Sequence, residues 1–258
     1  MVSLTINGKV VCAEEGEMVL TVTRREGIDI PALCHHEAVE PFGACRLCLV
    51  EITKKEWNGW TNYVTACLYP VEEGLIVQTH SSKVNELRRT ILDLMLARCP
   101  NSPEVRQLAA DHGVTQTAYE EMPDADNCIL CGLCTRVCER LGFNAISTVG
   151  RGHHKVVAAP LKEAPPDCVG CLSCAQVCPT NVIKYEDDGD QRRIWGRTFE
   201  LITCKQCGKY TITREFAEAL HTQRDIPLDY FDLCDECHRK ELSLKMGSIV
   251  NWSREAAS

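Results

Sequence analysis

One cysteine spacing occurs twice in this chain and constrains its fold more than any other feature. The first copy is Cys128-x2-Cys131-x2-Cys134-x3-Cys138, and the second copy begins 40 residues later at Cys168. This short spacing lets three thiolates of one loop meet three irons of a cubane cluster, while the fourth cysteine lies on the helix beyond. Two [4Fe–4S] clusters are therefore expected in this part of the chain.

The run C-x2-C-x2-C-x3-C is typical of bacterial two-cluster ferredoxins, in which the fourth cysteine of each run binds the other cluster. Residues 122–188 are predicted to form such a domain. A structural zinc site is the alternative, and eight cysteines in a doubled run disfavour it. The predicted ligands are Cys128, Cys131, Cys134 and Cys178 for the first cluster, and Cys138, Cys168, Cys171 and Cys174 for the second.

The chain has 18 cysteines among 258 residues, which is several times ordinary usage. It has no run of 18 apolar residues, and its longest candidate, residues 91–96, is interrupted by Asp93. The N-terminus lacks a charged region followed by an apolar run, so no secretory signal is expected. We predict a cytoplasmic location, where cysteines are more often metal ligands or redox groups than disulfides.

Four further cysteines lie in the first 80 residues: Cys34, Cys45, Cys48 and Cys67. Their spacing leaves a [2Fe–2S] cluster, a [4Fe–4S] cluster and zinc open, because ten residues separate the first pair where the plant-type [2Fe–2S] pattern has four. The flanking sequence predicts a hairpin at the Asn7-Gly8 turn, then a helix and three strands, over residues 2–6 and 9–13, 17–26, and 49–53, 63–66 and 75–79. This order favours a β-grasp ferredoxin domain over residues 1–80.

Three segments carry a resemblance to a known family: PALCHHEAVEPFGACRLCLVEI, TACLYPVEEGLIVQT and ELRRTILDLML. They resemble the N-terminal domain of the complex I large iron–sulfur subunit and the small electron-transfer subunit of the diaphorase module in bidirectional NiFe hydrogenases. The likeness continues to about residue 187 through NCILCGLCTRVCERLG, the Gly150-Arg151-Gly152 turn and DCVGCLSCAQVCPTNVI. The resemblance implies a [2Fe–2S] cluster on Cys34, Cys45, Cys48 and Cys67.

Residues 81–121 depart from the pattern of that family. The family has a His-x3-Cys-x2-Cys-x5-Cys run here that binds another [4Fe–4S] cluster, whereas this chain has LARCPNSPEVRQLAADHGV, with Cys99 alone. A serine-capped helix ending near Arg98 and a second helix beginning at Pro103 are predicted. We interpret the segment as a helical connector that lost its cluster. Electrons would then cross a wider gap or pass through a partner's cluster.

Residues 189–258 contain two C-x2-C pairs, Cys204 with Cys207 and Cys234 with Cys237. Two such knuckles make a tetrahedral four-sulfur site, and Gly208 permits the tight turn after the first pair. We predict a zinc-ribbon-like tail with structural zinc. Mononuclear iron, a further iron–sulfur cluster and a redox dithiol are the alternatives.

Two other interpretations of the tail are disfavoured. The stretch from Cys234 to His238 matches the C-x-x-C-H haem attachment signature, but covalent haem attachment goes with export. Nucleic-acid binding needs a basic face, whereas the whole chain has a net charge of −8. Helix-like stretches over residues 214–224 and 236–246 make the tail a candidate docking surface for a partner subunit.

Several residues outside these groups are given structural roles. Cys12 lies on a predicted strand and is expected to be a small buried apolar side chain. Cys99 is expected to be buried in the same way, or to be a relic of the lost cluster. Arg88 and Arg89 are expected to form a solvated helix face.

The sequence has no G-x-G-x-x-G after a strand, no G-x-x-x-x-G-K-[ST] and no nucleophile–base constellation, so we expect no catalysis by this chain alone. One-electron transfer is the chemistry that remains. The resemblance implies an electron-transfer subunit of a hetero-oligomeric oxidoreductase, without a membrane span. It would relay electrons between flavin- and NAD(P)-binding diaphorase subunits and a catalytic subunit of the hydrogenase or formate dehydrogenase type.

The predicted fold is therefore α+β and modular, with a β-grasp domain, a helical connector, a ferredoxin domain and a zinc-ribbon-like tail. The expected cofactors are one [2Fe–2S] cluster, two [4Fe–4S] clusters and one zinc or iron ion. A freestanding polyferredoxin-like carrier and a cluster-based redox-sensing interaction protein are the alternative functions.

Overall fold

Two compact units make up the structure, a computed structural model that describes residues 1–123 and 126–255, with side chains placed as far as Met246. Unit 1 comprises Met1–Leu141, Thr148–Ala158 and Cys174–Ile183. Unit 2 comprises Gly142–Ser147, Ala159–Ser173 and the chain from Lys184 onward.

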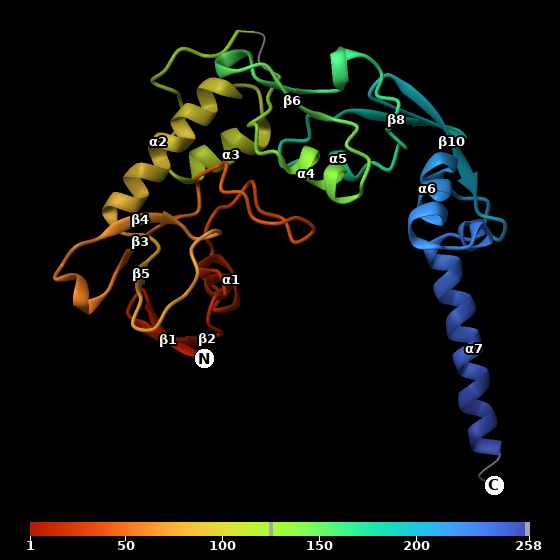
Figure 1. Cartoon of the computed structure of the whole chain (residues 1–258), viewed down its shortest axis with the longest axis horizontal. Helices are drawn as coiled ribbons and strands as arrows, with labels where there is room; N and C mark the ends of the chain where they lie inside the picture. Colours follow the sequence, from red (N-terminus) through yellow and green to blue (C-terminus); the bar gives the residue numbers. More distant parts are fainter. Residues whose placement is uncertain (124–125, 256–258) are drawn as a thin grey trace. The chain divides into compact units, whose positions relative to one another are not determined.

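Unit 1 begins with a five-stranded sheet in the order β2-β1-β5-β3-β4 (Figure 1). The hairpin of β1 and β2 turns at Asn7 and Gly8, whose φ angles of 50° and 87° suit the left-handed turn that hairpins favour. β1 pairs in parallel with β5, after the chain has passed through helix α1. The bounds are Val2–Ile6 (β1), Lys9–Ala13 (β2), Val19–Arg25 (α1), Leu49–Thr53 (β3), Lys55–Trp57 (η1), Asn62–Thr65 (β4) and Ile76–Gln78 (β5).

The hairpin, helix and strands expected in residues 1–80 are therefore present, with small shifts at their ends. Buried and partly exposed residues alternate along β1. This alternation places Val2, Leu4 and Ile6 on the buried face of the sheet. Val19, Leu20 and Val22 of α1 pack into the same core. This core fixes the sheet from which the cysteine loops of residues 34–48 and 67 extend.

Two serine-capped helices follow the sheet, α2 (Ser82–Arg98) and α3 (Pro103–Asp111). The hydroxyls of Ser81 and Ser102 accept hydrogen bonds from backbone N–H groups in the first turns, which satisfies donors that a helix cannot use itself. Helix α2 lies against β3 (Figure 1). The helices expected from the serines and Pro103 are therefore present.

The remaining elements alternate short helices and strands. A four-stranded antiparallel sheet of unit 2 has the order β11-β10-β9-β8, and a two-stranded ribbon joins β6 and β7. The helices are Leu133–Arg140 (α4), Ser173–Gln176 (α5), Arg214–Arg224 (α6) and Asp235–Glu255 (α7), with 3-10 turns at Gly152–His154 (η2), Pro160–Lys162 (η3) and Leu228–Asp232 (η4). The strands are Ser147–Val149 (β6), Val156–Ala158 (β7), Tyr185–Asp188 (β8), Gln191–Ile194 (β9), Arg197–Thr203 (β10) and Tyr210–Thr213 (β11).

The tail forms the two helices that its sequence predicts. Helix α6 has the expected bounds and is capped by Thr213. Helix α7 begins one residue before the expected stretch and continues well past it, running away from α6 and β10 (Figure 1). Among residues 1–123 and 126–255, no helix combines the length and apolar character needed to cross a membrane.

The expected buried position of Cys12 is wrong. Strand β2 is an edge strand whose buried residues are Val11 and Ala13. Successive side chains of a strand point to opposite faces, so Cys12 between them is exposed. Cys99, at the end of α2, is fully buried as expected.

A substitution on helix α2 tests the packing of the buried cluster that includes Cys34, Cys45 and Cys131. Leu92 is fully buried in a cluster with Cys34, Cys45 and Cys131. We expect Leu92→Ala to lower the free energy of unfolding by about 2–5 kcal/mol, because it leaves a cavity in packed surroundings. Chemical denaturation measures the change.

Leu94→Ala is the matched control on the same helix. Leu94 is 50% exposed, and its truncation should change the free energy of unfolding by less than about 0.5 kcal/mol. Equal losses in the two variants would contradict this packing of α2.

Candidate iron–sulfur and metal sites

The four cysteines of the first group come together in unit 1, and all are buried: Cys34, Cys45, Cys48 and Cys67. The thiol of Cys34 contacts those of Cys45 and Cys67, and the thiol of Cys48 contacts that of Cys67. Hydrogen bonding to these neighbours lowers the pKa of Cys34 and lowers that of Cys48 to about 7. The same hydrogen bonds raise the pKa of Cys45 and Cys67, so metal binding has to displace the protons of these two thiols. Four converging buried thiols nevertheless fit a thiolate-bound cluster.

The four cysteines predicted for the first [4Fe–4S] cluster also lie in unit 1. Cys131 and Cys134 are buried, whereas Cys128 and Cys178 are half-buried. Burial raises the pKa of Cys131 to about 11 and that of Cys134 to about 12. Without metal these thiols therefore remain protonated at neutral pH, and metal binding has to displace their protons.

The two repeated cysteine loops have the same unusual backbone conformation. Leu130 and Gly132 have φ angles of 53° and 73°, and the residues 40 positions later, Gly170 and Leu172, have 67° and 64°. Left-handed backbone costs a leucine roughly 1–2 kcal/mol, so its recurrence at a repeated position indicates a functional constraint. Left-handed turns of this kind point backbone N–H groups into a concavity that suits an anion. The N–H of Leu130 donates to Cys128 Sγ at 3.4 Å.

The second [4Fe–4S] set is divided between the units. Cys138 and Cys174 belong to unit 1, and Cys168 and Cys171 belong to unit 2. This ligand set therefore stays a prediction from the sequence repeat.

One arginine joins the first cysteine group to the first [4Fe–4S] loop within unit 1. Arg136 on α4 donates from Nη2 to the carbonyl oxygen of Cys34 at 2.9 Å and, in a longer contact of 3.5 Å, to that of Cys131. Its Nη1 donates to the carbonyl oxygen of Glu40, and its guanidinium lies 5.2 Å from the ring centre of Phe42. The same side chain therefore holds both loops within unit 1.

Helix α2 contributes two more arginines that hold cysteine loops. Arg98 donates from Nε to the carbonyl oxygen of Cys128 at 2.7 Å. Arg88 donates from Nε to the carbonyl oxygen of Leu47 and from Nη2 to that of Leu49, each at 3.0 Å. These two carbonyl groups lie on either side of Cys48 in the sequence.

The expected solvated position is wrong for Arg88, which is fully buried, whereas Arg89 is exposed. Residues four apart on a helix share a face, and Arg88 stands between the buried Val84 and Leu92. The spacing of Arg88 from Val84 and Leu92 therefore predicts that Arg88 is buried. Its residue type alone predicts a solvated position, because arginine side chains are seldom fully buried.

Two arginines of unit 2 hold the second repeated loop. Arg197 donates to the carbonyl oxygen of Cys168 at 2.6 Å. Arg192 donates to that of Gly170 at 3.2 Å, and forms a bidentate ion pair with Asp187 at 2.8 Å. Each repeated loop is therefore fixed by guanidinium donors to its main chain.

The tail brings its four cysteines into one compact group in unit 2: Cys204, Cys207, Cys234 and Cys237. Their sulfurs all lie within 4.8 Å of one another, and those of Cys207 and Cys234 are 3.7 Å apart. Thiolates about 2.3 Å from a tetrahedral zinc would lie about 3.8 Å apart. This spacing fits a single ion better than a cluster, which holds its cysteines farther apart around several irons.

Backbone N–H groups support the thiolate form of Cys204 in this group, whereas burial raises the pKa of Cys237 to about 12. The N–H of Cys234 donates to Cys204 Sγ at 3.3 Å and, with other backbone donors, lowers the pKa of Cys204 to about 6. Gly208, with a φ of 73°, donates to the carbonyl oxygen of Cys204 and closes the first knuckle. The group is thus arranged as a metal-binding knuckle pair.

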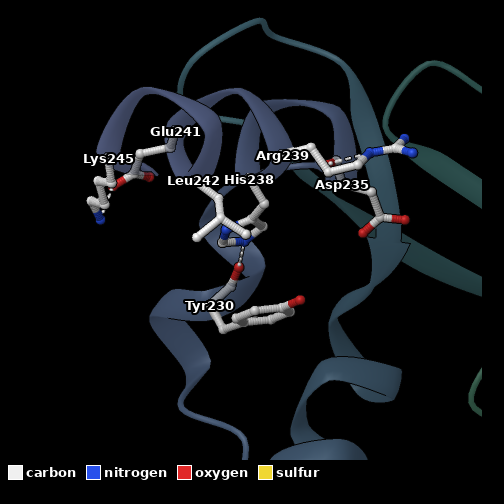
Figure 2. A pocket seen from close by; sticks show the side chains of 7 residues that line it. All are labelled: Tyr230, Asp235, His238, Arg239, Glu241, Leu242 and Lys245. Atoms are coloured by element: carbon white, nitrogen blue, oxygen red, sulfur yellow. Dashed lines mark hydrogen bonds and ion pairs between the residues drawn. The ribbon is translucent and has the colours of Figure 1, made fainter. Parts of the chain in front are cut away.

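The histidine of the C-x-x-C-H stretch is engaged elsewhere. His238 Nε2 lies 2.6 Å from the carbonyl oxygen of Tyr230, to which it can only donate, and the two rings stack 4.4 Å apart. Figure 2 shows the two side chains in a pocket that is also lined by Leu242 and Lys245 of α7. This arrangement favours a structural role for His238 over haem ligation.

Two family models match the chain. The 2Fe-2S iron-sulfur cluster binding domain matches residues 1–82, and the 4Fe-4S dicluster domain matches residues 122–185. Among solved structures, NAD+-reducing [NiFe]-hydrogenase in the H2-reduced state contains a chain that superposes with a TM-score of 0.59 at 28% identity, covering 70% of this chain and 85% of that one.

Three curated relatives show the same relationship in sequence. NADPH-Fe(3+) oxidoreductase subunit alpha of Geobacter sulfurreducens is 31% identical over 231 residues, and NADP-reducing hydrogenase subunit HndD of Solidesulfovibrio fructosivorans is 31% identical over 214 residues. A subunit of the NADH-quinone oxidoreductase of Rhizobium meliloti is 26% identical over 234 residues. The matches cover 80%, 71% and 81% of this chain, but only 27%, 36% and 27% of the relatives.

The chain thus spans about a quarter to a third of the length of these relatives. The resemblance inferred from its motifs is confirmed: this chain combines a 2Fe-2S iron–sulfur cluster binding domain with a 4Fe-4S dicluster domain, and it is similar to subunits of NAD(P)-linked oxidoreductases, hydrogenases and complex I.

Proposed function

We propose that this chain is an electron-transfer subunit of a multi-subunit NAD(P)-linked oxidoreductase. The observation that carries this proposal is the joining of two cysteine sets in unit 1, where Arg136 bonds to the carbonyl groups of Cys34 and Cys131. Two clusters held by such neighbouring loops suit one-electron transfer between them. When bound, iron–sulfur clusters supply this chemistry, with potentials set by ligands, hydrogen bonds and burial.

The ligand assignment follows the sequence groups. A [2Fe–2S] cluster is assigned to Cys34, Cys45, Cys48 and Cys67, and a first [4Fe–4S] cluster to Cys128, Cys131, Cys134 and Cys178. A second [4Fe–4S] cluster is assigned to Cys138, Cys168, Cys171 and Cys174. The domains are assigned as residues 1–80, 81–121, 122–188 and 189–258, the third being the two-cluster domain.

The tail is assigned a structural metal on Cys204, Cys207, Cys234 and Cys237. Zinc is favoured over mononuclear iron because a closed four-sulfur site of C-x2-C knuckles is a common structural zinc arrangement. Such a site stabilises a short tail that has a small apolar core of its own.

The partners are proposed from the relatives. Their names describe NAD(P)-linked, hydrogenase and quinone-reducing complexes. We propose a cytoplasmic hetero-oligomer in which flavin- and NAD(P)-binding diaphorase subunits exchange electrons with this chain. A hydrogenase- or formate-dehydrogenase-type subunit would be at the other end of the relay.

Metal analysis tests the cofactor assignment. Anaerobically purified chain should contain about ten irons and one zinc, from one two-iron and two four-iron clusters and one tail ion. Low-temperature EPR of the reduced chain should show [2Fe–2S] and [4Fe–4S] signals. Six or fewer irons would reject the two-cluster domain.

Single cysteine variants assign each metal. Cys48→Ser should remove the [2Fe–2S] signal and Cys207→Ser should remove zinc, each with the other metals retained. Cys12→Ser is the matched control, since the exposed Cys12 belongs to no group. A loss of iron in Cys207→Ser would indicate an iron site in the tail.

A substitution of Arg136 tests whether its side chain holds the loops of Cys34 and Cys131 together. Arg136→Met removes the hydrogen bonds to Cys34 and Glu40, each worth about 1 kcal/mol. Amide hydrogen exchange in residues 34–46, followed by mass spectrometry, should therefore become about 30-fold faster, the factor that corresponds to about 2 kcal/mol. Glu139→Met, on the same helix but with an exposed side chain, should leave that exchange unchanged. Equal effects of the two substitutions would contradict the role of Arg136 in holding the loops.

Purification of the native complex tests the function itself. The chain should co-purify with a flavoprotein, and its cluster EPR signals should appear on addition of NADH or NADPH. A monomer without partners would favour the freestanding carrier. A partner whose binding depends on cluster oxidation state, without reduction by NAD(P)H, would favour the redox sensor.

A further inference from the structure

Arg88 is a buried cation whose hydrogen bonds, within the part of the chain that the structure describes, go to main-chain carbonyl groups and not to a carboxylate. Its side chain is fully buried, and its hydrogen bonds go to the uncharged carbonyl oxygens of Leu47, Leu49 and Thr79, at 3.0, 3.0 and 3.3 Å. Its Nη1 is buried and has no hydrogen-bond partner within the part of the chain that the structure describes. Removing a guanidinium from water is costly unless a negative charge lies nearby.

The position of Arg88 indicates where that negative charge is. The two carbonyl groups at 3.0 Å belong to the residues immediately before and after Cys48. The guanidinium is therefore fixed to the main chain on both sides of this cysteine. Burial lowers the pKa of Arg88, and the negative charges of Cys48 and Asp29 oppose that shift. The cysteine set that includes Cys48 gains negative charge when it binds metal, and the guanidinium of Arg88 is fixed to the residues on both sides of Cys48.

A [2Fe–2S] cluster with four thiolates has a net charge of about −2 when oxidised and about −3 when reduced. A fixed positive charge in a low-dielectric interior stabilises the more negative state more strongly. We propose that Arg88 is the buried counter-charge of a [2Fe–2S] cluster on Cys34, Cys45, Cys48 and Cys67, and that its charge raises the reduction potential of this cluster.

This inference rests on the proposed assignment of those four cysteines. It adds a role for a residue that binds no metal and is remote in sequence from the four cysteines. The competing explanation is a solely structural role, in which Arg88 only holds three carbonyl groups in place by hydrogen bonds. The two explanations differ in what a charge-preserving substitution does.

The experiment is an EPR-monitored redox titration of the full chain with its clusters. Arg88→Gln removes the charge and should lower the ratio of reduced to oxidised [2Fe–2S] cluster at a fixed potential about tenfold, which is a shift of about 59 mV for one electron. Arg88→Lys keeps the charge but not the fork, and should stay within about threefold of the wild type. The [4Fe–4S] signals serve as internal references and should not shift.

Arg89→Gln is the matched control, because it removes the same charge from the exposed neighbour on α2. An unchanged ratio in Arg88→Gln, or an equal change in Arg89→Gln, would overturn the inference. If Arg88→Gln does not retain the cluster, Arg88→Lys decides: a ratio within threefold of the wild type supports the charge, and a tenfold fall overturns it.

The wild-type titration separates this inference from the assignment beneath it. A wild-type chain with no [2Fe–2S] signal would overturn the assignment of the four cysteines and the role of Arg88 together. A wild-type signal with an unchanged potential in Arg88→Gln would overturn the role of Arg88 alone.

Discussion

Hydrogen bonds from arginine side chains to the main chain hold the cysteine loops of this protein, and the arrangement of the candidate sites depends on them. Loops that surround a cluster have irregular backbone, so their carbonyl groups cannot be satisfied by helix or sheet partners. A guanidinium offers five donors in a planar fork and carries a charge opposite to that of a thiolate cluster. Five arginines supply such donors here: Arg88, Arg98, Arg136, Arg192 and Arg197.

The thiols of the sites differ in how strongly they depend on metal. Hydrogen bonds to neighbouring thiols or to backbone N–H groups lower the pKa of Cys34, Cys48 and Cys204. Hydrogen bonding to neighbouring thiols raises the pKa of Cys45 and Cys67, and burial raises the pKa of Cys131, Cys134 and Cys237. Metal binding must displace the protons of these thiols, so the assembly of each of these sites is coupled to pH. The left-handed leucines of the repeated loops add a conformational cost that a bound cluster can offset.

Much of the fold was predictable because the signals were local. The Asn7-Gly8 turn, the serine caps and the break at Pro103 each act through a few neighbouring residues, and the elements they predict are present. The two incorrect placements, Cys12 and Arg88, concern which way a side chain faces. Propensity alone places a cysteine inside and an arginine outside, whereas the edge position of β2 and the buried stripe of α2 decide otherwise.

The sequence by itself predicted the two iron–sulfur domains of this protein, because short cysteine spacings are a local pattern that is typical of such domains. The repeated spacing is matched by a repeated backbone conformation, since Leu130 and Gly170 both have left-handed φ angles. Only the tertiary structure decided that Arg136 joins two loops about 100 residues apart and that Arg88 is buried beside Cys48. Contacts between distant segments depend on how helices pack, and no local pattern encodes them.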